Sequence, residues 1–257
     1  METIYAIIIT IIGCIFASFF GVIISRVPKG LSIVKPASHC DSCGHELAWY
    51  ENIPILSYLF LGGKCKKCKA RIPLTSLFYE MLGGAVLLLT YLKVGLSIDL
   101  AFMAVITLLL LLIAGYDYRT NTILDVFWII LLVIVIGYDV YRVVALEESV
   151  WPYLIGCGIS LAFFGLVKLI FYFLLKVDAL GTGDIIFMGI AGLLLGYKTI
   201  LFAILIASVL GSIIELTLIG LKKRNKEDPI PFLPYLTLGV YITALYGLDL
   251  FNLLMGV

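Results

Sequence analysis

The chain has 257 residues, of which 62% are hydrophobic and only 14% are charged. This composition excludes an ordinary soluble globular domain, which carries far more charge and less apolar surface. The formal net charge of +1 gives no indication of a nucleic-acid partner.

Apolar segments of membrane-spanning length recur along the chain, and each predicts a transmembrane helix. Eight such segments lie near residues 4–24, 74–92, 99–116, 124–144, 151–175, 183–197, 199–220 and 232–254. The first is followed, not preceded, by basic residues, so we expect a retained helix and not a secretory signal. The sixth is short, and Gly192 and Gly196 would let the sixth and seventh helices pack closely. The expected fold is an all-α polytopic membrane protein with about eight transmembrane helices.

Basic residues are distributed unevenly between the loops. Eight of the eighteen follow the first helix, and they are Arg26, Lys29, Lys35, Lys64, Lys66, Lys67, Lys69 and Arg71. Six more belong to loops on the same side, and they are Arg119, Lys176, Lys222, Lys223, Arg224 and Lys226. The opposite loops hold only Lys93, Arg142 and Lys198. Because Lys and Arg accumulate in cytoplasmic loops, we expect the long loop inside the cell and both termini outside.

The long loop carries a metal-ligand pattern. It contains two CxxC pairs, which are formed by Cys40, Cys43, Cys65 and Cys68. The pairs are separated by 21 residues, and four thiolates at such a spacing suit a structural zinc ion. Two disulfides are the alternative, which a reducing cytoplasm disfavours. His39 and His45 flank the cluster, but four cysteines already complete a tetrahedral shell. The sequence therefore predicts a small cytoplasmic zinc-binding loop domain.

Two aspartates are the main candidates for chemistry. Asp117 ends one apolar segment, and Asp184 follows Gly-Thr-Gly at the start of another. A carboxylate at a membrane helix end is costly to keep, so it indicates function by default. Two carboxylates can divide the roles of general acid and general base, which suggests an aspartyl protease at a membrane surface. Asp125 is the rival within the first segment, but we expect it to cap the following helix. An N-cap role is also open to Asp184.

Four segments, in order, resemble a known family. The loop reads Cys40-Asp-Ser-Cys-Gly-His-Glu-Leu-Ala-Trp-Tyr-Glu-Asn-Ile-Pro54, and its end reads Arg71-Ile-Pro-Leu-Thr-Ser-Leu-Phe-Tyr-Glu80. The aspartates stand in Asp117-Tyr-Arg-Thr-Asn-Thr-Ile-Leu-Asp125 and Gly181-Thr-Gly-Asp184, and Pro231-Phe-Leu-Pro234 precedes the last helix. The chain thus resembles bacterial type IV prepilin leader peptidases with an attached N-methyltransferase activity.

The resemblance implies roles for these residues. Asp117 and Asp184 would be the catalytic pair of a GxGD membrane aspartyl peptidase, whose substrates are type IV prepilin or pseudopilin precursors of pili, secretion or competence. S-adenosylmethionine would be the methyl donor. Glu80 is a candidate for the methyl-transfer site, or alternatively a simple helix-end carboxylate. The protein would lie in the bacterial inner membrane with its active site toward the cytoplasm.

The resemblance also divides the chain into parts. Residues 1–24 would form the first transmembrane helix, 25–74 the methyltransferase-associated zinc loop, 75–98 the second helix, and 99–257 a six-helix peptidase domain. The family pattern Gly-Ser-Phe-x-Asn at the end of the first helix is altered here, where Ala17 and Gly21 replace its Gly and Asn.

Two other functions therefore remain open. One is a peptidase without methyltransferase activity. The other is an ion or metal transporter that uses Asp117, Asp184 and Glu215 as intramembrane ligands. No feature of the sequence indicates the oligomeric state.

Overall fold

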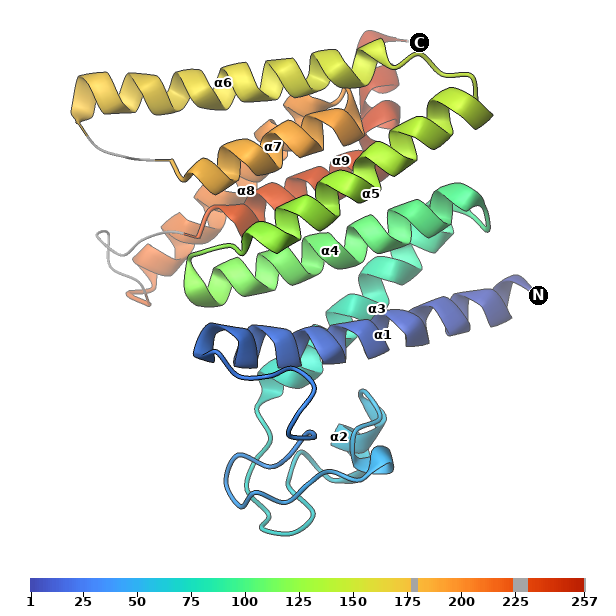
Figure 1. Ribbon diagram of the computed structural model, residues 1–257, viewed down its shortest axis with the longest axis vertical. Coiled ribbons are helices and arrows are strands. Elements are labelled where there is room, and N and C mark those ends of the chain that lie inside the picture. The colour runs from blue at the N-terminus through green and yellow to red at the C-terminus, as the bar shows by residue number, and fades with distance from the viewer. Residues whose placement is uncertain (177–179, 224–230, 257) are drawn as a thin grey trace. The chain divides into compact units, whose positions relative to one another are not determined.

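The fold is helical, as predicted. The computed structural model describes residues 1–176, 180–223 and 231–256, and Arg224 and Lys226 of the charge argument lie outside them. The chain divides into two compact units, Met1–Leu100 and Ala101–Val257 (Figure 1). Seven of its described helices are long and apolar enough to cross a membrane. The chain is therefore a multi-pass membrane protein.

The first unit consists of two long helices and the loop between them. Its helices are α1 (Glu2–Arg26), the short α2 (Leu56–Phe60) and α3 (Leu74–Val94), with 3-10 turns at Val27–Lys29 and Trp49–Glu51. Glycines bring α1 and α3 together: a Cβ built on Gly84 would lie 2.6 Å from Sγ of Cys14, and one on Gly83 would lie 2.6 Å from the carbonyl oxygen of Gly13. Because these residues are small, the backbones of α1 and α3 come into close contact.

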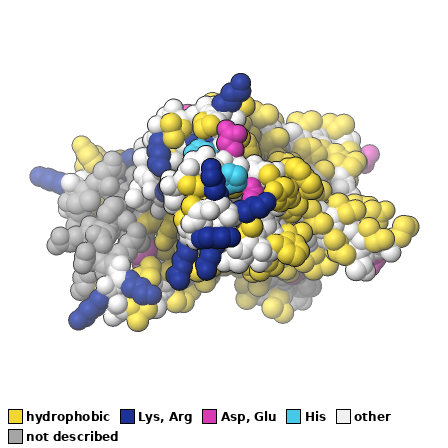
Figure 2. Space-filling model, turned by 90° about the horizontal axis from the view of Figure 1, so that it is seen from below, with side chains coloured by type: hydrophobic (Ala, Val, Ile, Leu, Met, Phe, Trp, Pro, Cys, Tyr) yellow, Lys and Arg dark blue, Asp and Glu magenta, His cyan; other side chains and the backbone are white. Residues whose placement is uncertain are grey.

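The loop of this unit has a cationic surface. Figure 2, which looks onto this loop, shows Lys and Arg side chains gathered over it. Arg26 ties the start of the loop to the end of α1, because its guanidinium donates to the carbonyl oxygens of Ser32, Pro36 and Ala37 at 3.3, 2.7 and 3.2 Å.

The second unit is built around its shortest helix. Its elements are α4 (Ile98–Thr120), whose first turn still belongs to the first unit, α5 (Asp125–Ala145), α6 (Trp151–Leu175), α7 (Thr182–Leu195), α8 (Ile200–Gly220) and α9 (Leu233–Met255). Of these, α7 packs against α5, α6, α8 and α9. Phe187 and Met188 on α7 are fully buried. The helix that begins with the GxGD motif is thus the core of this unit.

The short sixth span is α7. Its glycines pack against a different helix from the one expected. The helix ends at Leu195 because Gly196 turns the backbone with a φ of +73°. A Cβ built on Gly156 of α6 would lie 2.6 Å from the carbonyl carbon of Gly196 and would also meet the carbonyl oxygen of Gly192. These glycines therefore pack α7 against α6 and not, as predicted, against the following helix.

Candidate active site and metal centre

The two predicted aspartates meet at one end of the second unit. Asp117 lies in the last turn of α4 and is only 6% exposed. Asp184 lies in the first turn of α7, close enough for its charge to act on the carboxyl of Asp117. The backbone N–H of Leu233, at the start of α9, faces the Asp117 carboxylate. Three helix ends thus converge on the pair.

The glycines of the GxGD motif have different surroundings. A Cβ on Gly181 would lie 3.3 Å from Oδ2 of Asp184, on the exposed side of the motif. A Cβ on Gly183 would instead lie 3.2 Å from Cδ1 of Ile123 and 3.5 Å from the Trp128 ring. Gly183 therefore seats α7 against α5, whereas Gly181 leaves space beside the carboxylate.

The capping roles expected of two aspartates are not observed. The N-cap of α7 is Gly181, and Asp184 is the third helical residue, whose carboxylate accepts a hydrogen bond from the Gly181 N–H. The N-cap of α5 is Leu124, so Asp125 is the first helical residue and is exposed. Asp125 makes no side-chain cap there, and its carboxylate acts on the helix only through the dipole.

Four sulfur atoms in the long loop form a compact cluster. The ligand atoms of Cys40, Cys43, Cys65 and Cys68 all lie within 4.8 Å of one another. Sγ of Cys40 lies 3.8 Å from Sγ of Cys68, and Sγ of Cys43 lies 4.0 Å from Sγ of Cys65. Metal–sulfur bonds of about 2.3 Å in a tetrahedron place sulfurs about 3.8 Å apart. All six cysteines are free, so the cluster fits a tetrahedral metal ion and not a pair of disulfides.

The two halves of the cluster share one backbone pattern. The N–H of Gly44 donates to the Cys40 carbonyl at 2.9 Å, and the N–H of Lys69 donates to the Cys65 carbonyl at 3.0 Å. Both donors have positive φ, +67° and +60°. Each CxxC pair is therefore a turn that presents two sulfurs to the same point, as the spacing predicted.

The electrostatics of the sulfurs favour a bound cation. The backbone N–H groups of Ser42 and Cys43 lower the pKa of Cys40 to about 7. The backbone N–H of Ala70 also favours the thiolate of Cys68, but the neighbouring sulfurs, Cys43 first, outweigh it and raise the pKa of Cys68 to about 11. All four sulfurs can ionise together only when a cation offsets their charge.

The flanking histidines have other partners. Nδ1 of His39 lies 2.9 Å from the carbonyl oxygen of Ala37, and Nε2 of His45 lies 3.2 Å from Oε2 of Glu51. The same Glu51 oxygen accepts the N–H of Ala48 at 2.9 Å, and this hydrogen bond is the main cause of the lowered pKa of Glu51. The buried Glu51 thus stiffens the loop beside the cluster.

Glu80 connects three parts of the first unit. Its Oε1 accepts the hydroxyl of Ser18 on α1 at 2.8 Å, and its Oε2 accepts the N–H of Ile55 in the loop at 2.7 Å. Ile55 has a φ of +63°, strained for a β-branched residue, at the centre of a turn closed from Leu56 N–H to Pro54 carbonyl at 2.6 Å. Both oxygens of Glu80 are therefore engaged in holding the loop.

We expect Glu80→Ala to destabilise the first unit by about 1–3 kcal/mol, because it leaves the Ile55 N–H without its acceptor and frees a strained turn. Ile55→Gly should recover part of this loss in the same background, since glycine adopts positive φ without strain. Thermal unfolding in detergent measures both effects. Equal melting temperatures for Glu80→Ala with and without Ile55→Gly would contradict the link between the carboxylate and the turn.

Sequence reasoning missed several partners of these sites. Leu233 belongs to a segment quoted for the family resemblance, Ser18 to the altered pattern of the first helix, and Ile55 directly follows the quoted loop segment. Nothing in their residue types indicated which side chain they would contact. Glu215, the candidate transporter ligand, is buried on α8 and accepts the hydroxyl of Tyr235 at 2.6 Å.

Comparisons with known proteins agree with the geometry. The profile described as "Bacterial Peptidase A24 N-terminal domain" matches residues 11–94, and that of the "Type IV leader peptidase family" matches residues 104–216. No solved structure matches the chain significantly.

Relatives named Prepilin leader peptidase/N-methyltransferase match most of the chain, among them the following three. The Dichelobacter nodosus protein is 31% identical over 224 residues, which cover 86% of this chain and 76% of the relative. The Myxococcus xanthus protein is 29% identical over 87% of this chain and 68% of the relative. The Bacillus subtilis protein is 28% identical over 93% of this chain and 94% of the relative. The chain, with its paired aspartates and four-cysteine cluster, therefore belongs to the type IV leader peptidase family.

Proposed function

We propose that this protein is a membrane aspartyl endopeptidase that removes the leader from type IV prepilin-like precursors and then N-methylates the new terminal residue. The observation that carries the proposal is the meeting of Asp117 and Asp184 at the end of a membrane helix bundle, in a member of this family. The substrate has a short basic leader followed by a hydrophobic helix, and cleavage occurs at their junction on the cytoplasmic face of the inner membrane.

Cleavage follows from two close carboxylates that share one proton. The ionised aspartate accepts a proton from water as the water oxygen bonds to the scissile carbonyl carbon. The protonated aspartate donates to the carbonyl oxygen. The C–N bond then breaks as the leaving nitrogen takes a proton from one aspartate. As the C=O bond re-forms, the other aspartate accepts a proton from a hydroxyl of the tetrahedral intermediate, so the pair again holds one proton. Which of the two aspartates begins protonated does not affect this balance.

Methylation belongs, in this proposal, to the first unit. The four cysteines would hold a structural zinc ion, which would fix the two CxxC turns to each other. S-adenosylmethionine supplies the methyl group to the new N-terminal amine. Glu80 acts by positioning the loop on α1 and α3, because both of its oxygens are already engaged. In terms of sequence, residues 25–74 are the methyltransferase-associated loop and residues 99–257 the peptidase domain.

A precursor assay distinguishes this function from its alternatives. Purified protein is incubated with a pilin precursor and S-adenosylmethionine, and the product is weighed by mass spectrometry. Loss of the leader and gain of one methyl group support the bifunctional enzyme. A trimmed but unmethylated product would indicate a peptidase without methyltransferase activity. An unchanged precursor would favour the transporter.

The charge pattern also predicts the topology. A cysteine introduced at Leu146 should react from outside with a membrane-impermeant thiol reagent, whereas one at Lys223 should react only after the membrane is opened. The exposed native thiols are Cys43 and Cys68, so modification is scored at the introduced cysteine by peptide mapping. Labelling of position 223 in intact cells would reverse the orientation and place the aspartates on the outer face.

A further inference from the structure

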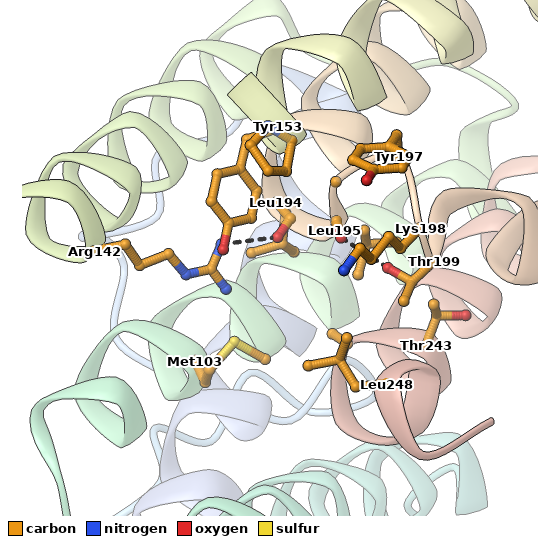
Figure 3. A pocket seen from close by; sticks show the side chains of 13 residues that line it. Met103, Arg142, Tyr153, Leu194, Leu195, Tyr197, Lys198, Thr199, Thr243 and Leu248 are labelled. Atoms are coloured by element: carbon orange, nitrogen blue, oxygen red, sulfur yellow. Dashed lines mark hydrogen bonds between the residues drawn. The ribbon is translucent and has the colours of Figure 1, made fainter. Parts of the chain in front are cut away.

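A cavity of about 240 Å³ lies at the far ends of the helices that carry the aspartates. Its lining includes Met103 near the start of α4 and Leu194 near the end of α7 (Figure 3). Met103 is 14 residues before Asp117, which is roughly 21 Å along a helix. The cavity is therefore separate from the proposed peptidase site.

One basic side chain forms a wall of the cavity. Nη1 of Arg142 donates to the carbonyl oxygen of Leu194 at 3.0 Å and lies 3.3 Å from Oδ1 of Asp139. Its guanidinium also stacks against the rings of Tyr138 and Tyr153, 3.9 and 4.7 Å from their centroids. Among the described residues, the second terminal nitrogen has no hydrogen-bond partner. Arg142 is thus fixed in place with donors to spare.

A second basic side chain enters from the opposite wall. Lys198 is exposed, and its ammonium is directed toward the cavity in Figure 3. It forms no ion pair within residues 1–176, 180–223 and 231–256, and its Nζ lies 5.8 Å from the centroid of the Phe251 ring. The nearby carboxylates are already engaged, Asp139 with Arg142 and Glu148 with the hydroxyl of Tyr153. The ammonium of Lys198 is therefore available to a ligand.

The rest of the cavity is apolar and well held. Met103 and Leu194 are 5% and 4% exposed and form its inner part. The loop that carries Lys198 is fixed to α6, because the N–H of Tyr197 donates to the carbonyl of Pro152 at 2.9 Å. The long helices α6 and α8 both begin here, so their positive dipole ends add to the basic charge. A cationic mouth above an apolar interior suits an amphipathic anion.

We propose that this cavity binds the headgroup of an anionic phospholipid from the adjacent membrane leaflet. Lys198 and Arg142 would contact the phosphate, and the glycerol ester would lie over Met103 and Leu194. Basic residues are scarce on this side of the membrane by the charge pattern, yet two of the three line this one cavity. Free inorganic phosphate offers the same charge but makes no use of the apolar interior.

The test is lipid retention in native mass spectrometry of the full chain. Detergent-purified protein is titrated with phosphatidylglycerol, with phosphatidylcholine of equal chain length, and with inorganic phosphate. Wild type should retain phosphatidylglycerol preferentially. Lys198→Glu should weaken that binding by about 25-fold, since each basic charge contributes about fivefold. Lys198→Arg should retain it, and Lys93→Glu, which alters a basic residue outside the cavity, should leave it unchanged.

Two results would overturn the proposal. One is equal phosphatidylglycerol retention by Lys198→Glu and wild type, with the helix content of both verified by circular dichroism. The other is retention of inorganic phosphate with no preference for phosphatidylglycerol over phosphatidylcholine. That result would make the cavity a simple anion site. Neither result bears on leader cleavage, because Lys198 is distant from the aspartates.

Discussion

Asp117→Asn and Asp184→Asn are each expected to lower the rate of leader release by about 10²- to 10⁴-fold. Asparagine is nearly isosteric with aspartate, but it can neither accept the catalytic proton nor share one across the pair. The double variant should be little worse than either single variant, because one change already disables a unit that works together. The measurement is the initial rate of leader release on a purified precursor.

Asp125→Asn is the matched control for this prediction. Asp125 belongs to the same segment as Asp117, but it is exposed in the first turn of α5. Its loss should therefore have a mild effect on the rate. If Asp125→Asn were inactive while Asp117→Asn kept most of its rate, the assignment within the first motif would be wrong. Near-normal cleavage by all three variants would rule out the aspartyl mechanism itself.

The second large effect concerns the metal. Protein prepared without chelators should contain about one zinc ion per chain, and Cys43→Ser should lose most of it. Because metal binding and folding of such a loop are coupled, the variant should also become sensitive to proteolysis between α1 and α3 and lose methyl transfer. Leader release should persist, since the aspartates belong to the other unit.

Cys157→Ser provides the control for the metal prediction. It removes a thiol within α6, in the other unit, and should leave zinc content and methylation unchanged. Metal analysis and a methylation assay on pre-cleaved pilin give the two readings. Stoichiometric disulfides with no zinc in the wild-type protein would contradict the metal site.

The long helices could be predicted because the bilayer imposes their length and composition. The end of α7 could be predicted only approximately, because the predicted segment runs to 197 whereas Gly196 turns the backbone after Leu195. The helix that packs against the glycines of α7 could not be predicted. A pair of small residues indicates that another backbone approaches closely, but not which backbone it is. Gly156 of α6 fills that role, and its own sequence surroundings carry no signal for it.

The same limit applies to the candidate sites: local structure could be predicted, but contacts between distant segments could not. The spacing of the cysteines predicted one cluster, since each CxxC turn is a local structure. Glu80 was ambiguous in sequence because its partners Ser18 and Ile55 are 62 and 25 residues away. The contact of Leu233 with Asp117 likewise depends on how α9 packs. Arg142 and Lys198 looked like ordinary loop residues, and only the fold brings them to one cavity.

A mixing experiment tests most directly the central claim that cleavage and methylation use separate sites in one chain. Asp184→Asn should methylate pre-cleaved pilin but leave the precursor intact, and Cys43→Ser should trim the precursor without methylating it. When both variants are added to one precursor with S-adenosylmethionine, mass spectrometry should show a product that has lost its leader and gained one methyl group. A product that stays trimmed but unmethylated in the mixture would contradict the claim.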